Sequence, residues 1–148
     1  MEPLVEATMI SLRQLQRDLR DGLAAQPADV LNWLPYPGGN TIAGLVAHMY
    51  EAGNFLLHSG LGETVTRERD RQFASSVPGA DALLAHVDDS TGNLLDLAAR
   101  YDAAALAARR DFRGTPVPGA WFLLHCCEHL LEHWGQIQTI RDLANQAG

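Results

Sequence analysis

Histidines are the residues of this chain whose spacing most clearly predicts chemistry. His129 and His133 are four residues apart in a stretch with helical periodicity, WFLLHCCEHLLEHWGQIQ. Two imidazoles at that spacing lie one turn apart on one helix face and can bind the same metal ion. His48 lies on the apolar face of another predicted helix. Three inward-facing histidines on two helices therefore predict a metal site within a helical bundle.

The predicted ligand set also narrows the kind of metal site. Three neutral imidazoles leave coordination positions open, which is typical of catalytic rather than structural sites. Zn²⁺ or Ni²⁺ is the ion that we expect first, although nitrogen ligands alone also allow Fe²⁺ or Mn²⁺. The alternative is that the histidines are core residues and bind no metal. Burying three unpaired imidazoles without a metal would carry a desolvation cost that nothing else in the sequence offsets.

The glutamates and cysteines of the same stretch allow two further interpretations. The pattern H-x-x-E-H occurs twice within 125–133 and matches the inverted zincin motif of metalloproteases. We discount a protease because Glu132 lies about 100° around the helix from His133 and because the chain is short for a substrate cleft. Cys126 lies one turn before His129 on the same arc, so it is either a fourth ligand or a small buried residue.

Four long segments with helical periodicity must position these histidines. We expect helices over residues 2–24, 41–59, 79–100 and 120–147, and a short Ala-rich piece over 102–109. Asn40 is the expected N-cap of the second helix, and the Pro- and Gly-rich residues 115–119 indicate a break before the last. The polar stretch 61–78 is expected to be a long loop that could cover the site. The chain is thus predicted to be one all-α domain over 1–148, an antiparallel four-helix bundle.

The composition excludes several classes of function. The 148 residues carry a formal net charge of −7, and all 11 basic residues are arginines. Such an acidic chain would repel a phosphate backbone, so we expect no nucleic-acid partner. The adjacent cysteines Cys126 and Cys127 bridge each other poorly on a helix, which favours a reduced chain. Because the sequence shows neither a signal peptide nor an apolar run of membrane-spanning length, we expect a cytoplasmic protein. The tryptophans are expected to be packing anchors, at positions 33, 121 and 134.

Further motifs surround the three histidines. They are Trp33-Leu34-Pro35, the helix start Asn40-Thr41-Ile42, and the run His133-x-Gly135-Gln136-Ile137 that follows His129. Together with His48, these motifs resemble the DinB-like superfamily, and the resemblance covers nearly the whole chain. It implies a four-helix bundle, often dimeric, whose metal ligands are His48, His129 and His133. The chain departs from the family's common His-His-Arg-Gly-Gln pattern, because Glu132 replaces the first His and Trp134 replaces the Arg.

The resemblance also implies an activity. Characterised members of the family include metal-dependent S-transferases that use low-molecular-weight thiols and small-molecule substrates. A metal lowers the pKa of a bound thiol, so the three-histidine site would activate it as a thiolate. The candidates for groups that contact the metal ligands and fix their orientation are Glu51, Glu132 and Cys126. The alternative function is that of a metal-binding bundle without catalysis, acting as a stress-related sensor or binding protein.

Overall fold

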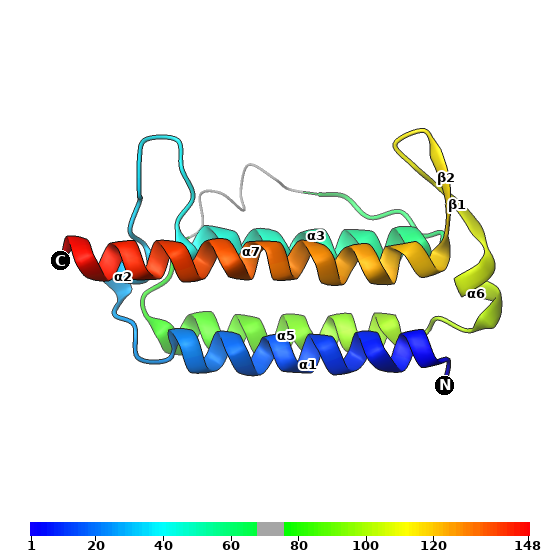
Figure 1. Ribbon diagram of the computed structural model, residues 1–148, viewed down its shortest axis with the longest axis horizontal. Helices are drawn as coiled ribbons and strands as arrows, with labels where there is room; N and C mark the ends of the chain where they lie inside the picture. Colours follow the sequence, from blue (N-terminus) through cyan, green and yellow to red (C-terminus); the bar gives the residue numbers. More distant parts are fainter. Residues whose placement is uncertain (68–75) are drawn as a thin grey trace.

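The computed structural model describes residues 1–67 and 76–148, and its fold is mainly helical (Figure 1). The long helices are α1 (Pro3–Leu23), α3 (Ile42–Gly60), α5 (Ala80–Ala98) and α7 (Gly119–Ala147). The shorter elements are α2 (Ala28–Leu31), α6 (Ala103–Ala107), β1 (Arg109–Phe112) and β2 (Thr115–Pro118). The predicted mainly helical class is confirmed, and each long helix begins and ends within about two residues of its expected position. None of the described helices is long and apolar enough to cross a membrane.

The long helices pack around one core, but not all neighbours are antiparallel. Helix α1 contacts α5 and α7, and α3 contacts the same two helices. In Figure 1, α1 and α7 run from right to left, whereas α3 and α5 run from left to right. The pairs α1–α5 and α3–α7 are therefore antiparallel, as expected, whereas α3–α5 and α1–α7 are parallel.

The long connection between α3 and α5 is the physical reason for this difference. Two parallel neighbours need a connection that spans a whole helix, which is about 28 Å for 19 residues at 1.5 Å each. The chain between Gly60 and Ala80 is long enough, because an extended chain covers about 3.3 Å per residue. Residues 61–67 and 76–79 contain no helix, in agreement with the predicted loop, and the rest of that predicted loop lies outside the described residues.

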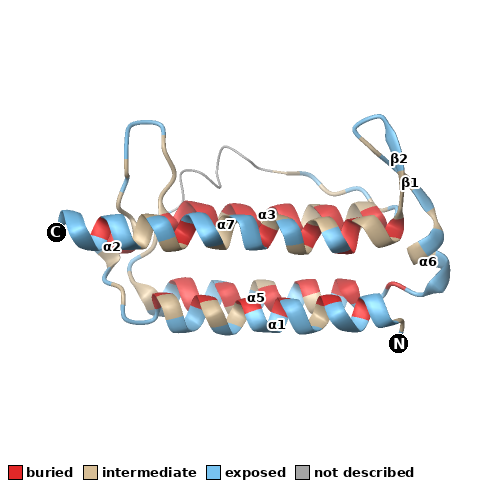
Figure 2. Cartoon of the chain, viewed as in Figure 1, coloured by how far each residue is buried: buried red, intermediate tan, exposed pale blue. Residues whose placement is uncertain are grey.

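The amphipathic pattern of α1 shows how the core forms. Its apolar stripe is buried, with exposed fractions of 3% or less, at Val5, Leu12, Leu15, Leu19 and Leu23. The opposite face of α1 is exposed (Figure 2). Burying one such side chain stabilises the fold by roughly 1.5–3 kcal/mol. The one polar residue on the stripe, Thr8, is satisfied because its hydroxyl donates to the carbonyl of Leu4 at 2.8 Å.

The start of α3 differs from the expectation by one residue. Thr41, not Asn40, is the N-cap, and its hydroxyl accepts a hydrogen bond from the backbone N–H of Gly44 at 2.9 Å. Asn and Thr both cap helices well, so residue type alone could not decide between two neighbours. The one-turn helix α2 was also missed within the connector that precedes α3.

A β-hairpin stands where the sequence indicated a break. Strands β1 and β2 pair in antiparallel register from Arg109↔Pro118 to Phe112↔Thr115. Arg113 and Gly114 connect them with φ of 52° and 85°, and two consecutive left-handed residues are typical of a type I′ hairpin turn. Prolines usually argue against a strand because they lack the N–H of the ladder, which is why β2 was missed. A strand in a two-stranded hairpin tolerates them, because one of its edges makes no ladder.

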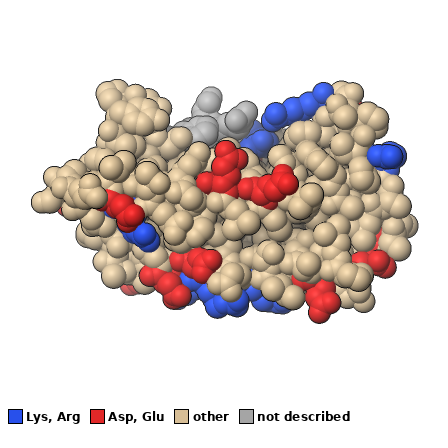
Figure 3. Space-filling model, in the orientation of Figure 1, with Lys and Arg blue, Asp and Glu red and all other residues tan. Residues whose placement is uncertain are grey.

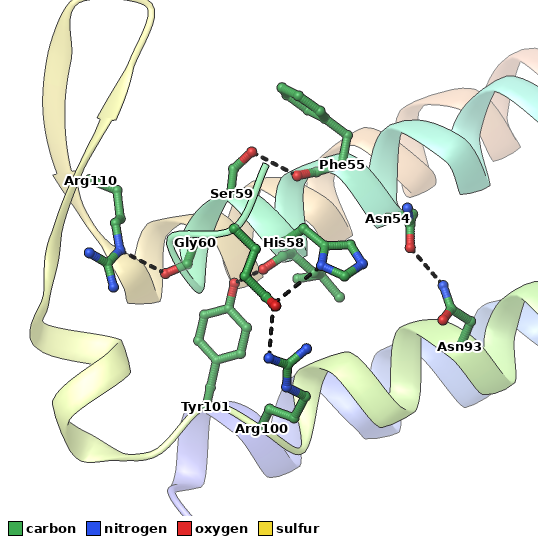
Figure 4. Close-up of polar contacts among 11 residues, drawn as sticks. Asn54, Phe55, His58, Ser59, Gly60, Asn93, Arg100, Tyr101 and Arg110 are labelled. Carbon is green, nitrogen blue, oxygen red and sulfur yellow. Dashed lines mark hydrogen bonds and ion pairs between the residues drawn. The ribbon is translucent and has the colours of Figure 1, made fainter. Parts of the chain in front are cut away.

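The C-terminal end of α3 is held by a dense set of polar contacts (Figure 4). We call this set the α3-end cluster, and it comprises His58, Gly60, Glu63, Arg100 and Tyr101. The hydroxyl of Tyr101 donates to the carbonyl of Leu57 at 2.6 Å, and Glu63 contacts Arg100 at 2.9 Å and His58 at 3.3 Å. Gly60 is needed there because a Cβ at its position would lie 2.8 Å from Cβ of Phe122.

Candidate metal centre

The three predicted ligand histidines meet between α3 and α7. His48 comes from α3, and His129 and His133 come from α7. One ring nitrogen from each lies within 4.8 Å of the others, and the ring centroids are 4.5–5.4 Å apart. Two imidazole nitrogens on one tetrahedral ion lie about 3.4 Å apart when each metal–nitrogen distance is about 2.1 Å. Side-chain movements of up to about 1 Å would therefore bring all three onto one ion.

The hydrogen bonding of His129 fits a metal ligand. Its Nε2 atom is buried and has no hydrogen-bond partner among the described residues. Burial, with smaller contributions from the nearby imidazoles of His133 and His48, lowers the pKa of His129 from 6.5 to about 4. His129 is therefore neutral at pH 7, the protonation state that metal ligation requires. A buried nitrogen without a partner among the described residues, beside two other imidazoles, fits a divalent transition metal.

His133 is oriented by a neighbour one turn further along α7. Its Nδ1–H donates to Oε1 of Gln136 at 2.7 Å, so the lone pair is left on Nε2. Such a partner fixes both the tautomer and the ring orientation of a ligating histidine. Sequence reasoning gave Gln136 no role, although its i+3 spacing from His133 on a helix would have placed it within reach.

The three residues expected to orient the metal ligands differ in their burial and in their contacts. Glu51 lies one turn after His48 on α3, and its carboxylate pairs with Arg67 at 3.2 Å. Glu132 is exposed and lines a cavity beside His133. Cys126 is fully buried, and burial raises the pKa of its thiol, so Cys126 is an uncharged core residue in this structure. The cysteine is not among the residues whose donor atoms cluster.

The remaining residues of the histidine-rich stretch lie outside the cluster. His125 stacks on Trp121 with ring centroids 4.4 Å apart and planes 15° from parallel, and its Nδ1 lies 3.5 Å from Glu128. Glu128 and Glu132 are exposed, so neither projects into the site as the base of a metalloprotease would. Acidic side chains are visible over the middle of α7 in Figure 3.

Arg67 is a site residue that sequence reasoning missed. Its Nε donates to Glu51, and its guanidinium carbon lies 5.1 Å from the ring centroid of Phe55. The Nη2 atom is buried and makes no hydrogen bond within the described part of the chain. The positive charge of Arg67 also contributes to the low pKa of His129. No sequence signal could have found Arg67, because only the fold brings residues 61–67 back over α3.

A cavity of about 810 Å³ lies between α7 and the 33–40 connector, and its wall includes neighbours of His133 but none of the three histidines. Its wall includes Glu132, Gly135 and Gln136, which flank His133 on α7, and Leu45, which precedes His48 on α3. The other side is formed by the 33–40 connector, with Trp33, Pro35, Tyr36 and Asn40. A largely apolar hollow of this size is typical of small-molecule sites. Trp33, expected to be a packing anchor, is therefore also part of a cavity wall.

Solved structures share this fold at low sequence identity. A DinB-like protein from Bacillus cereus has a TM-score of 0.74 and 19% identity, covering 95% of this chain and 92% of that chain. A conserved protein from Enterococcus faecalis has a TM-score of 0.81 and 14% identity, covering 99% of both chains. A DinB-like protein from Bacillus subtilis has a TM-score of 0.68 and 14% identity, covering 97% of this chain and 93% of that chain.

Comparison with protein families agrees with these structures. No curated protein matches the chain. The family model of the DinB superfamily matches residues 11–137, which include all three clustered histidines. The chain belongs to the DinB superfamily.

Proposed function

We propose that this chain is a single-domain, four-helix-bundle enzyme that transfers a low-molecular-weight thiol to an electrophilic small molecule at a three-histidine metal site. His48, His129 and His133 are the proposed ligands. The observation that carries the proposal is the buried Nε2 of His129, which has no partner among the described residues although two other imidazoles lie beside it. A polar atom buried in this way costs about 1–3 kcal/mol unless a ligand satisfies it.

The chain's own residues would do three things in this reaction. The three imidazoles hold a divalent cation, and Gln136 keeps the lone pair of His133 on Nε2 by accepting its Nδ1–H. A bound metal of this kind lowers the pKa of a thiol and so supplies a thiolate nucleophile. The cavity beside His133, whose wall is largely apolar, would accommodate the electrophile.

The ion that suits this site best is Zn²⁺ or Ni²⁺. Three nitrogen ligands are acceptable to both, and open positions remain for a sulfur ligand. Fe²⁺ and Mn²⁺ are less well matched because they bind nitrogen and sulfur ligands more weakly in the divalent series. Elemental analysis decides among the four ions.

The first test is metal content by elemental mass spectrometry, on protein purified without an affinity tag or chelator. We expect about one transition-metal ion per chain and near zero in His48→Ala, His129→Ala and His133→Ala. His58→Ala is the matched control, because His58 lies on α3 but pairs with Glu63 instead of joining the cluster. Stoichiometric metal in two of the three site variants would overturn the ligand assignment.

The activity is tested on the metal-loaded protein with cysteine and 1-chloro-2,4-dinitrobenzene. In that reaction the sulfur–carbon bond forms, chloride leaves and the thiol proton passes to solvent. We expect a rate above the uncatalysed reaction that disappears in His133→Ala. A loaded protein that never exceeds the uncatalysed rate with any thiol or electrophile tested would contradict the transferase proposal.

One observation favours the non-catalytic alternative. Trp134 occupies the position of the family's Arg, and its ring packs against α1, 2.7 Å from where a Cβ of Gly22 would stand. Any role of that Arg toward a substrate is therefore replaced by packing in this chain. If the protein binds metal but transfers no thiol, a sensor or binding function becomes the better proposal.

A further inference from the structure

Two buried side-chain atoms in the described part of the chain lack a hydrogen-bond partner, and both belong to this site. They are Nε2 of His129 and Nη2 of Arg67. Buried polar groups in native proteins are nearly always paired, so unpaired ones need an explanation. The metal proposed above explains the imidazole. It does not explain the guanidinium, because a cation would repel it.

The surroundings of Arg67 place it beside the metal ligands. Arg67 pairs with the carboxylate of Glu51, which follows His48 by three residues on α3. The guanidinium of Arg67 also lies over the ring of Phe55, one helical turn after Glu51. The Arg67 side chain is 19% exposed, so solvent reaches only part of it. Through Glu51, Arg67 is thus held against the same helix as His48, close to the proposed metal ligands.

Among the described residues, the charges of the metal-loaded site would not balance without another anion. Three neutral imidazoles with a divalent ion carry two positive charges, Arg67 adds one, and Glu51 removes one. Glu132 is exposed and lines the cavity beside His133. A thiolate alone would leave one positive charge in the site. A ligand with a second negative group would place it against Nη2, where a charge-assisted hydrogen bond is possible.

We propose that Arg67 binds an anionic group, such as a carboxylate, on the thiol co-substrate. The inference rests on the proposed function and names the substrate class: thiols that carry a negative charge a few bonds from the sulfur. Glu51 holds Nε and thereby orients Nη2 toward the ligand. The cavity beside His133 remains for an apolar electrophile.

The test uses Co²⁺-loaded protein and two thiols of nearly equal shape, 3-mercaptopropionate and 3-mercapto-1-propanol. Thiolate binding to Co²⁺ is followed by the sulfur-to-cobalt charge-transfer absorption. We expect the anionic thiol to bind about tenfold more tightly at equal thiolate concentration, which is the effect of one hydrogen bond between charged groups. In Arg67→Gln the preference should disappear.

Two matched variants separate ligand binding from a structural ion pair. Glu51→Gln removes the partner but keeps Arg67, so the preference for 3-mercaptopropionate should persist or increase. If Arg67 acts only by pairing with Glu51, then Glu51→Gln and Arg67→Gln would behave alike. Arg20→Gln is the surface control, because Arg20 pairs with Asp88 between α1 and α5.

The outcomes also distinguish this inference from the proposed function. A protein that fails to bind Co²⁺ contradicts the metal site itself. If Co²⁺ and both thiols bind without a preference in the wild type, or with a preference that Arg67→Gln retains, the metal site survives and the role of Arg67 is refuted. If Arg67→Gln retains the preference, the carboxylate of 3-mercaptopropionate binds the metal ion directly.

Discussion

The middle and the end of α3 arrange their polar side chains in opposite ways. At the α3-end cluster, His58 and Arg100 both meet Glu63, and the hydroxyl of Tyr101 meets a backbone carbonyl (Figure 4). In the middle, His48 meets two other imidazoles, and the Nε2 of His129 has no partner within the described residues. The first arrangement holds the fold together without a ligand. The second leaves donor atoms for a ligand to satisfy.

The contrast explains why histidines on the same helix have different roles. A carboxylate next to an imidazole favours a structural pair, as at His58. Neighbouring imidazoles help to lower the pKa of His129, which keeps its lone pair available for a metal. Whether a histidine is a ligand thus depends on its neighbours in space rather than on its burial.

The largest expected effect is metal-dependent stability. Zn²⁺ at about a thousand times its dissociation constant should raise the free energy of unfolding by about 4 kcal/mol, provided that the unfolded chain binds it weakly. His58→Ala should keep this gain, whereas His129→Ala should lose it. Denaturant titrations with and without Zn²⁺ measure this gain in the free energy of unfolding for each variant. Equal gains in His58→Ala and His129→Ala would contradict the distinction between the α3-end cluster and the metal site.

The α3-end cluster should tolerate added side-chain volume poorly. Gly60→Ala places a methyl group against Tyr101 and Phe122, so we expect a loss of about 2–3 kcal/mol in the free energy of unfolding. Gly92→Ala in α5 is the control, because nothing lies within 4 Å of its Cβ position. That variant should gain up to about 1 kcal/mol from helix propensity. Chemical denaturation of both variants checks the sign of each change.

Gln136 should affect metal affinity without affecting metal stoichiometry. Gln136→Leu removes the acceptor of the His133 Nδ1–H, which should weaken Zn²⁺ or Co²⁺ binding about tenfold. Gln138→Leu on the same helix is the matched control and should bind as the wild type does. Competition with a chromogenic chelator measures the two affinities, and equal values would show that Gln136 is not needed to orient the ligand.

Removing one polar group from each region should have opposite effects on the metal-free protein. Tyr101→Phe loses a buried hydrogen bond and leaves the Leu57 carbonyl unpaired, so stability should fall by about 1 kcal/mol. His129→Leu removes an imidazole that had no partner, so stability should rise by about 1 kcal/mol. If both variants are destabilised alike, His129 is already satisfied in the metal-free protein.

The last effect concerns pH. Burial and the neighbouring imidazoles lower the pKa of His129 from 6.5 to about 4. Between these values the unfolded chain binds a proton that the folded chain does not, so the free energy of unfolding of metal-free protein should fall as the pH drops through this window. In His129→Leu the curve should be flatter between pH 6.5 and 4. Thermal unfolding across this range, with chelator present, makes the comparison.

Local chemistry allowed much of the molecule to be predicted. The four long helices follow from apolar periodicity, and their ends lie within about two residues of where the sequence predicts them. The i,i+4 spacing alone puts His129 and His133 on one face of α7, and the periodicity of α3 puts His48 among core residues. These are short-range properties of a helix, so they did not depend on the rest of the chain.

Only the tertiary structure decided how these pieces meet. The parallel course of α3 and α5, the pairing of the proline-containing β2 with β1, and the position of Arg67 over α3 all depend on contacts between distant residues. The same holds for the cavity between the 33–40 connector and α7, and for the meeting of His48 with the α7 histidines. Periodicity determines which face of a helix is buried, but the packing of whole helices against one another determines which residues that face contacts.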